Sequence, residues 1–183
     1  MERPRTTDRR LVRSRLDYVL IPALILGVVN SIVLSLPEAL GVRVAPDSPW
    51  PPLRHLHTWA VEQEPQHVVM PPTLQASLLY DGTVQLAMML VLVVALIRLN
   101  QPRWLSTLAI VYAVGGVMNM YFYFMQTFLG PDRPPHLATY LPINLPWLIV
   151  PVLVAYRFWR SPQLAGFAVQ TSASSDGDVA SVG

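Results

Sequence analysis

Long apolar stretches, separated by shorter polar segments, dominate the chain between positions 17 and 160. Four of them reach about 20 residues or more, the length that an α-helix needs to cross a hydrocarbon core of about 30 Å. They cover 17–36, 74–99, 104–129 and 140–158. The pattern predicts an all-α, polytopic membrane protein in which residues 17–160 form a bundle of four transmembrane helices.

The first apolar stretch has no small-residue cleavage site and runs directly into Pro37-Glu38, so we expect it to be a span and not a signal peptide. The longest polar interruption, 37–72, is rich in Pro and contains Trp50 and Trp59. A connection of this length in a compact protein is usually functional. We therefore expect 37–72 to be a long loop that caps the bundle.

Composition supports a membrane protein, since 52% of the residues are hydrophobic and only 13% are charged. The chain contains no cysteine, which excludes a disulfide, a thiolate metal site and a cysteine nucleophile. Its 13 strongly basic residues are all arginines, a composition that favours a bacterial cell membrane as the location.

Arginine placement predicts the orientation of the spans. The arm 1–16 is basic, and further arginines lie between spans two and three and at the end of span four. By the positive-inside rule, both termini are expected in the cytoplasm and 37–72 on the other side. Beside a first span, such an arm favours a topology signal that contacts anionic lipid over a nucleic-acid site. The cytoplasmic tail 161–183 is expected to be disordered from about 171, where apolar periodicity ends.

Polar residues inside the spans mark the interior of the bundle. A carboxylate at mid-membrane costs roughly 2.5–3.5 kcal/mol, so Asp81 should face protein or water. Gln85 follows it by one turn on the same face. The other spans carry polar or aromatic groups at a similar depth, in their non-cytoplasmic halves: Asn30, Asn119, Tyr123, Asn144 and Trp147. A shared depth on all four helices favours one chamber over separate interhelical hydrogen bonds, which average about 0.6 kcal/mol each.

Other chemistry is not indicated by the sequence. His55-x-His57 and His67 suggest a metal site, but no carboxylate has a matching spacing. No phosphate-binding loop, Ser-His-Asp set or dinucleotide fingerprint is present. We therefore predict neither a metal nor a cofactor.

The order of several motifs resembles the EXPERA family, which includes the emopamil-binding sterol isomerase and the sigma-two receptor. The run from Asn144 through Trp147 to Pro151 is similar to the last helix of that family. The resemblance covers about 27–160 and includes three further motifs: Val114-Gly115-Gly116 through Tyr123-Phe124, Pro71-Pro72 followed by Asp81 and Gln85, and Glu64-Pro65.

This resemblance implies a pocket within the bundle that opens sideways to the bilayer and takes sterols or cationic amphiphiles. In the isomerase, a protonated acid adds a proton to a sterol double bond and a base removes another. The carbocation in between is stabilised by carboxylates and aromatic rings. The residues expected to contact the ligand are Asn30, Glu64 at the cavity mouth, Asp81, Gln85, Asn119, Tyr123, Asn144 and Trp147.

The chain departs from the isomerase pattern at three positions. Asn30 stands where the isomerase has a histidine, and Leu34 and Thr127 stand where it has glutamates. We therefore expect a binding protein for a sterol-like or isoprenoid lipid or a cationic amphiphile, with Asp81 as the lone countercharge. The alternative is an isoprenoid or sterol double-bond isomerase or cyclase that uses Asp81 as its acid. A homodimer, or a role as a subunit that stabilises another membrane protein, also stays open.

Overall fold

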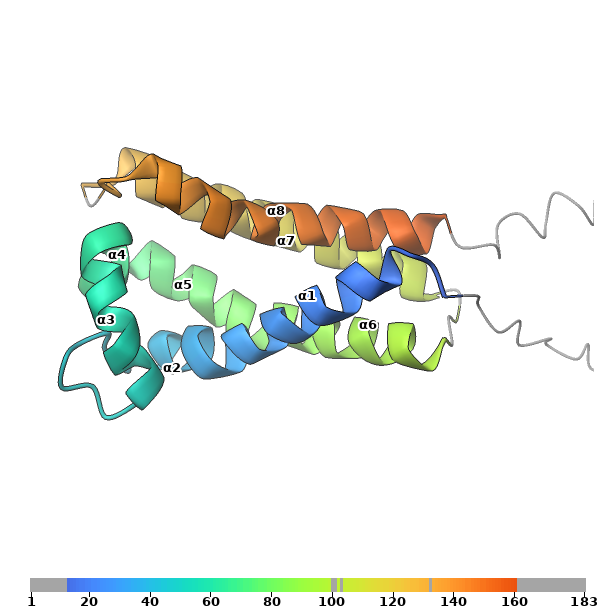
Figure 1. Ribbon diagram of the computed structural model, residues 1–183, viewed down its shortest axis with the longest axis horizontal. Coiled ribbons are helices and arrows are strands. Elements are labelled where there is room, and N and C mark those ends of the chain that lie inside the picture. Colours follow the sequence, from blue (N-terminus) through green and yellow to red (C-terminus); the bar gives the residue numbers. More distant parts are fainter. Residues whose placement is uncertain (1–12, 100–101, 103, 132, 161–183) are drawn as a thin grey trace, which may run out of the picture.

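The protein is built from helices. The computed structural model describes residues 13–99, 102, 104–131 and 133–160, and none of these residues forms a strand. Four helical segments are long and apolar enough to cross a membrane, and they run along one common axis (Figure 1): Asp17–Ala39, Pro72–Arg98, Trp104–Leu129 and Leu137–Trp159. The prediction of an all-α protein with four spans is confirmed. The first 12 residues of the basic arm and the tail from 161 lie outside the described residues.

The first two spans share one construction, in which a single π-helical turn interrupts an α-helix near its middle or end. The wider turn of a π-helix often lies at functional sites. In the first span, this turn ends two residues before Pro37, which has no N–H for the helical ladder. The elements are α1 (Asp17–Asn30), η1 (Ser31–Ser35) and α2 (Leu36–Ala39), then α5 (Pro72–Tyr80), η2 (Asp81–Gln85) and α6 (Leu86–Arg98).

The observed spans begin and end within three residues of the predicted ones. The second span starts at Pro72 because proline is well suited to the first turn of a helix, where its missing N–H has no partner to lose. The third span is α7 (Trp104–Leu129) and the fourth is α8 (Leu137–Trp159). α8 tolerates three internal prolines, at positions 142, 146 and 151.

The segment 37–72, predicted to be a long loop that caps the bundle, contains two helices, α3 (Pro51–Gln63) and α4 (Gln66–Val69). Two prolines open α3, and Leu53 and Ala60 lie two turns apart on its buried face. The Trp50 indole, directly before α3, donates a hydrogen bond to the Val33 carbonyl at 2.7 Å. Figure 1 shows α3 and α4 across one end of the bundle, which we call the capped end.

The opposite end of the bundle, the far end, is a dry apolar core. Its side chains come from α1, α6, α7 and α8 and include Leu20, Leu24, Leu92, Leu96, Leu105 and Phe158, each at most 1% exposed. One buried ion pair closes this core: Arg157 contacts both carboxylate oxygens of Asp17, at 2.6 and 3.0 Å. It joins the first span to the last.

Candidate functional site

A cavity of about 360 Å³ lies between the four spans and the inner side of α3, nearer to the capped end. Its size is within the range of ligand pockets in proteins. All eight residues expected to contact a ligand line this cavity: Asn30, Glu64, Asp81, Gln85, Asn119, Tyr123, Asn144 and Trp147. The polar residues that were predicted to lie at a similar depth in the membrane therefore line one cavity. Their role in binding stays a prediction.

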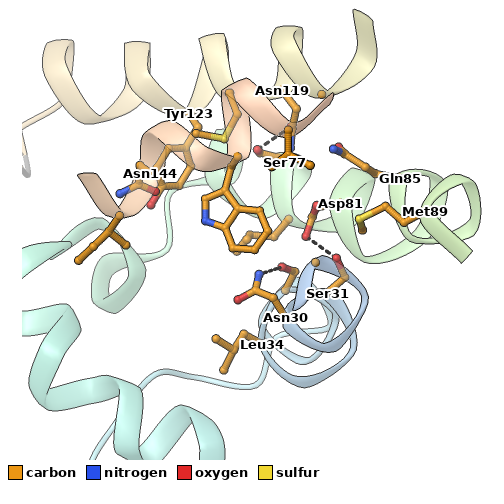
Figure 2. A pocket seen from close by; sticks show the side chains of 18 of the residues that line it. Asn30, Ser31, Leu34, Ser77, Asp81, Gln85, Met89, Asn119, Tyr123 and Asn144 are labelled. Carbon is orange, nitrogen blue, oxygen red and sulfur yellow. Dashed lines mark hydrogen bonds between the residues drawn. The ribbon is translucent and has the colours of Figure 1, made fainter. Parts of the chain in front are cut away.

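Asp81 lies where the two π-helical turns face each other. It is the first residue of η2, and its carboxylate accepts a hydrogen bond of 2.9 Å from the Ser31 hydroxyl of η1, as Figure 2 shows. The spans come close here because Gly82 has no side chain: a Cβ at this position would lie 2.9 Å from the Leu36 Cα. The sequence therefore places the carboxylate at a contact between two helices, within the cavity wall.

Two further polar residues lie along the same side of the cavity. Ser77 donates a hydrogen bond of 2.7 Å to the Asn119 side-chain oxygen, which joins α5 to α7 (Figure 2). Gln85 is 7% exposed, and its buried carbonyl oxygen has no hydrogen-bond partner within the described part of the chain. A buried acceptor without a donor costs about 1–3 kcal/mol. The Gln85 carbonyl oxygen could therefore accept a hydrogen bond from a ligand in the cavity.

The capped end of the cavity holds a cluster of two carboxylates and a histidine. His67 Nδ1 lies 2.7 Å from a Glu38 carboxylate oxygen, and its Nε2 lies 3.2 Å from Glu64. Burial alone would lower the pKa of His67, but the facing carboxylates outweigh burial and raise this pKa from 6.5 to about 10. At neutral pH, His67 is therefore an imidazolium that bridges Glu38 and Glu64.

Glu64 is held in this cluster by two other helices. The Tyr123 hydroxyl of α7 donates to its Oε2 at 2.7 Å, and the Asn144 amide of α8 donates to its Oε1. Glu64 directly follows α3 and is only 4% exposed, and its expected position at the cavity mouth stays a prediction. The end of α3 is thus fixed to the transmembrane bundle by hydrogen bonds to a single carboxylate.

Of the three residues that depart from the isomerase pattern, two line the cavity and one does not. Asn30 and Leu34 both line the cavity, with Asn30 donating a long hydrogen bond of 3.5 Å to Ser35. Thr127 does not line it: the residue is 1% exposed, and its hydroxyl belongs to a hydrogen-bond network in which it donates to Gln66 of α4, at 2.8 Å, and to the Tyr123 carbonyl, at 2.9 Å. The Tyr140 hydroxyl completes that network at 3.0 Å.

The expectation of a lone countercharge is wrong. Glu38, Glu64 and Asp81 all line the cavity, together with His67, and no arginine of the described residues does so. Glu38 and His67 both lie in the segment 37–72, for which the sequence predicts a loop. Two signals were available: Glu38 follows the first span without a break, and His67 lies one helical turn after Glu64, on the same face.

Among the described residues, no group of three or more His, Asp or Glu side chains has an arrangement that could hold a metal ion. His55 and His57 belong to α3, and neither lines the cavity. The acid–histidine cluster is therefore best described as a hydrogen-bonded and ionic group. Its chemistry is that of charge stabilisation and proton transfer.

Comparison with known proteins adds no assignment. No family model, no curated protein and no solved structure matches the chain.

Proposed function

We propose that the protein is a membrane-embedded binding protein for a sterol-like or isoprenoid lipid or a cationic amphiphile, of the kind that the EXPERA resemblance implies. The observation that carries the proposal is the cavity itself, which lies among four apolar spans and has carboxylates in its wall. A cavity of this kind in a membrane protein suits a hydrophobic molecule that carries a polar or positively charged group.

The chemistry of the lining supports a cation in particular. Three carboxyl groups and one histidine line the cavity, and no arginine of the described residues does, so acidic groups outnumber basic ones at the site. Trp147 lines the same cavity, and an indole face attracts a cation with about 0.5–2 kcal/mol or more. The low dielectric of the site strengthens both attractions relative to water.

Our proposal includes the setting of the protein. It is a multi-pass protein of a bacterial cell membrane with both termini in the cytoplasm, and its ligand reaches the cavity from the bilayer. The exposed surface of the spans is suited to lipid, since it presents many large apolar side chains, such as Val29, Leu90, Val94, Val111 and Ile149.

Native mass spectrometry of protein extracted gently from its own membrane tests the proposal. We expect a co-purified hydrophobic molecule, and its mass identifies the ligand class. The variant Asp81→Asn should weaken binding of a cationic amphiphile and retain neutral lipid, whereas the exposed control Asp47→Asn should bind as the natural chain does. A protein that carries no lipid and binds no amphiphile in either form contradicts the proposal.

A second candidate is an isoprenoid or sterol double-bond isomerase or cyclase. The specific observation in its favour is that Asp81 is not the lone titratable group of the cavity, since Glu38, Glu64 and His67 also line it. A protonated acid could add a proton to one carbon of a double bond, and a carboxylate could remove a proton from a neighbouring carbon. Isomerisation of a sterol double bond in a yeast strain that lacks its own isomerase tests this candidate, with Asp81→Asn as the inactive variant.

A further inference from the structure

Two clusters of polar groups lie at different depths in the cavity. The capped-end cluster consists of Glu38, Glu64, His67, Tyr123 and Asn144, which hydrogen bonds join to one another. The mid-span cluster consists of Ser31, Asp81 and Gln85. Figure 2 shows Tyr123 and Asn144 on one side of the cavity and Asp81 and Gln85 on the other.

The distance between the clusters follows from three helices that line both. On each of these helices, one lining residue marks the mid-span depth and another, seven positions away, marks the capped end. The pairs, with the mid-span residue first, are Ser31 and Glu38 on the first span, Gly116 and Tyr123 on α7, and Pro151 and Asn144 on α8. Gly116 marks the mid-span depth because a Cβ on it would lie 3.0 Å from the Gln85 amide and 2.9 Å from Pro151. Seven residues of helix rise roughly 10 Å.

The space between the clusters is mainly apolar. Each of the three helices places an apolar side chain there, midway between its two marker residues: Leu34, Met120 and Trp147, all of which line the cavity. Two polar residues also line the cavity at this depth: Ser77 of α5 and Asn119 of α7, which are hydrogen-bonded to each other at 2.7 Å. Ser35 also lines the cavity at this depth, and it accepts a hydrogen bond from Asn30. The middle of the cavity therefore presents three apolar side chains, and its polar side chains are already paired with one another.

Both clusters have capacity for a donor group. The Gln85 carbonyl oxygen is buried and unpartnered among the described residues, and it lies one turn from the Asp81 carboxylate. At the capped end, two carboxylates share one imidazolium. Hydrogen-bond donors or positive charges at both depths would complement this arrangement, and hydrocarbon would complement the middle.

We propose that the ligand of this cavity carries two donor or cationic groups, one for each cluster, separated by roughly 10 Å of hydrocarbon. This inference rests on the proposed binding function and narrows it to a two-headed amphiphile lying along the bundle axis. A ligand with one polar head would leave one of the two clusters in contact with hydrocarbon.

The test compares octylamine with 1,8-diaminooctane, whose two nitrogens are roughly that far apart in the extended chain. Both are titrated into the full-length protein in detergent micelles, using the fluorescence of its tryptophans. Asp81→Asn should weaken both amines. Glu38→Gln should weaken the diamine about tenfold or more, since it removes one charge-assisted bond, and should change octylamine less than twofold. The exposed control Asp47→Asn corrects for partition into micelles.

A chain-length series of diamines on the unaltered protein gives a second measurement that needs no folded variant. Affinity should pass through a maximum near 1,8-diaminooctane, with shorter and longer diamines weaker. An affinity that only rises with chain length, or a Glu38→Gln variant that affects both amines equally, overturns the two-headed ligand and leaves the binding function intact. If no amine and no lipid binds, both proposals fail.

Discussion

Removal of one partner from the Asp17–Arg157 ion pair should destabilise the protein by about 3–5 kcal/mol. Arg157 is 7% exposed and Asp17 is fully buried, so neither charge can turn to water in the folded state. Two charge-assisted hydrogen bonds join them, each worth about 1.5–3 kcal/mol, and their sum agrees with that range. Both residues also lie at favourable helix ends, the acid in the first turn of α1 and the base in the last turn of α8.

The variant Asp17→Asn tests this prediction, because it keeps the shape of the side chain and removes only its charge. Its free energy of unfolding in mixed micelles should fall by the stated amount, and Arg157→Gln should behave similarly. The double variant should cost much less than the sum of the two, since no charge is then left buried alone. Arg160→Gln, an exposed neighbour, is the control. Single variants that cost less than about 1 kcal/mol, or costs that simply add, would refute the reasoning.

Three further predictions concern the capped end, the helix contact and the topology. The pKa of His67 is raised from 6.5 to about 10, so its positive charge stabilises the fold fully below pH 6.5, and this contribution is lost as the pH rises toward 10. The melting temperature of the natural protein should therefore fall over this pH range, and that of His67→Gln should not show this fall. Gly82→Ala should cost about 1–3 kcal/mol, because its Cβ would lie 2.9 Å from the Leu36 backbone; the exposed neighbour Thr83→Ala serves as control, and equal melting of the two variants would contradict the close contact. Reporter fusions at the two termini should both give a cytoplasmic signal, and a signal from the other side of the membrane at either end would reverse our topology.

The sequence allowed the spans to be predicted because their signal is long and repeated. A stretch of apolar residues over 104–129 has one plausible structure, and α7 occupies those residues as expected. Asp81 was also found from the sequence, since a carboxylate inside such a stretch must face the interior. These predictions depend on chemistry along one segment and need no knowledge of tertiary contacts.

The acid–histidine cluster could not be predicted in the same way. Glu38, Glu64 and His67 lie outside the four predicted stretches, in a region whose many prolines suggested a loop. Their charges are buried only because α3 folds across the end of the bundle and brings Glu64 under Tyr123 and Asn144. That contact joins residues 59 and 80 positions apart, a distance over which local patterns carry no information.

The π-helical turns η1 and η2 have a consequence for how this chain can change. A residue advances an α-helix by about 100°, so one extra residue accommodated in a wider turn rotates the two halves of a span relative to each other. Loss of one residue from η2 would restore a regular helix and would turn either Asp81 away from Ser31 or α6 away from the apolar core of the far end. An insertion or deletion here changes which helix face meets which neighbour, while all other residues of the span stay the same. Single-residue length variation at these two turns would thus be a route by which relatives of this chain acquire a different cavity on the same bundle.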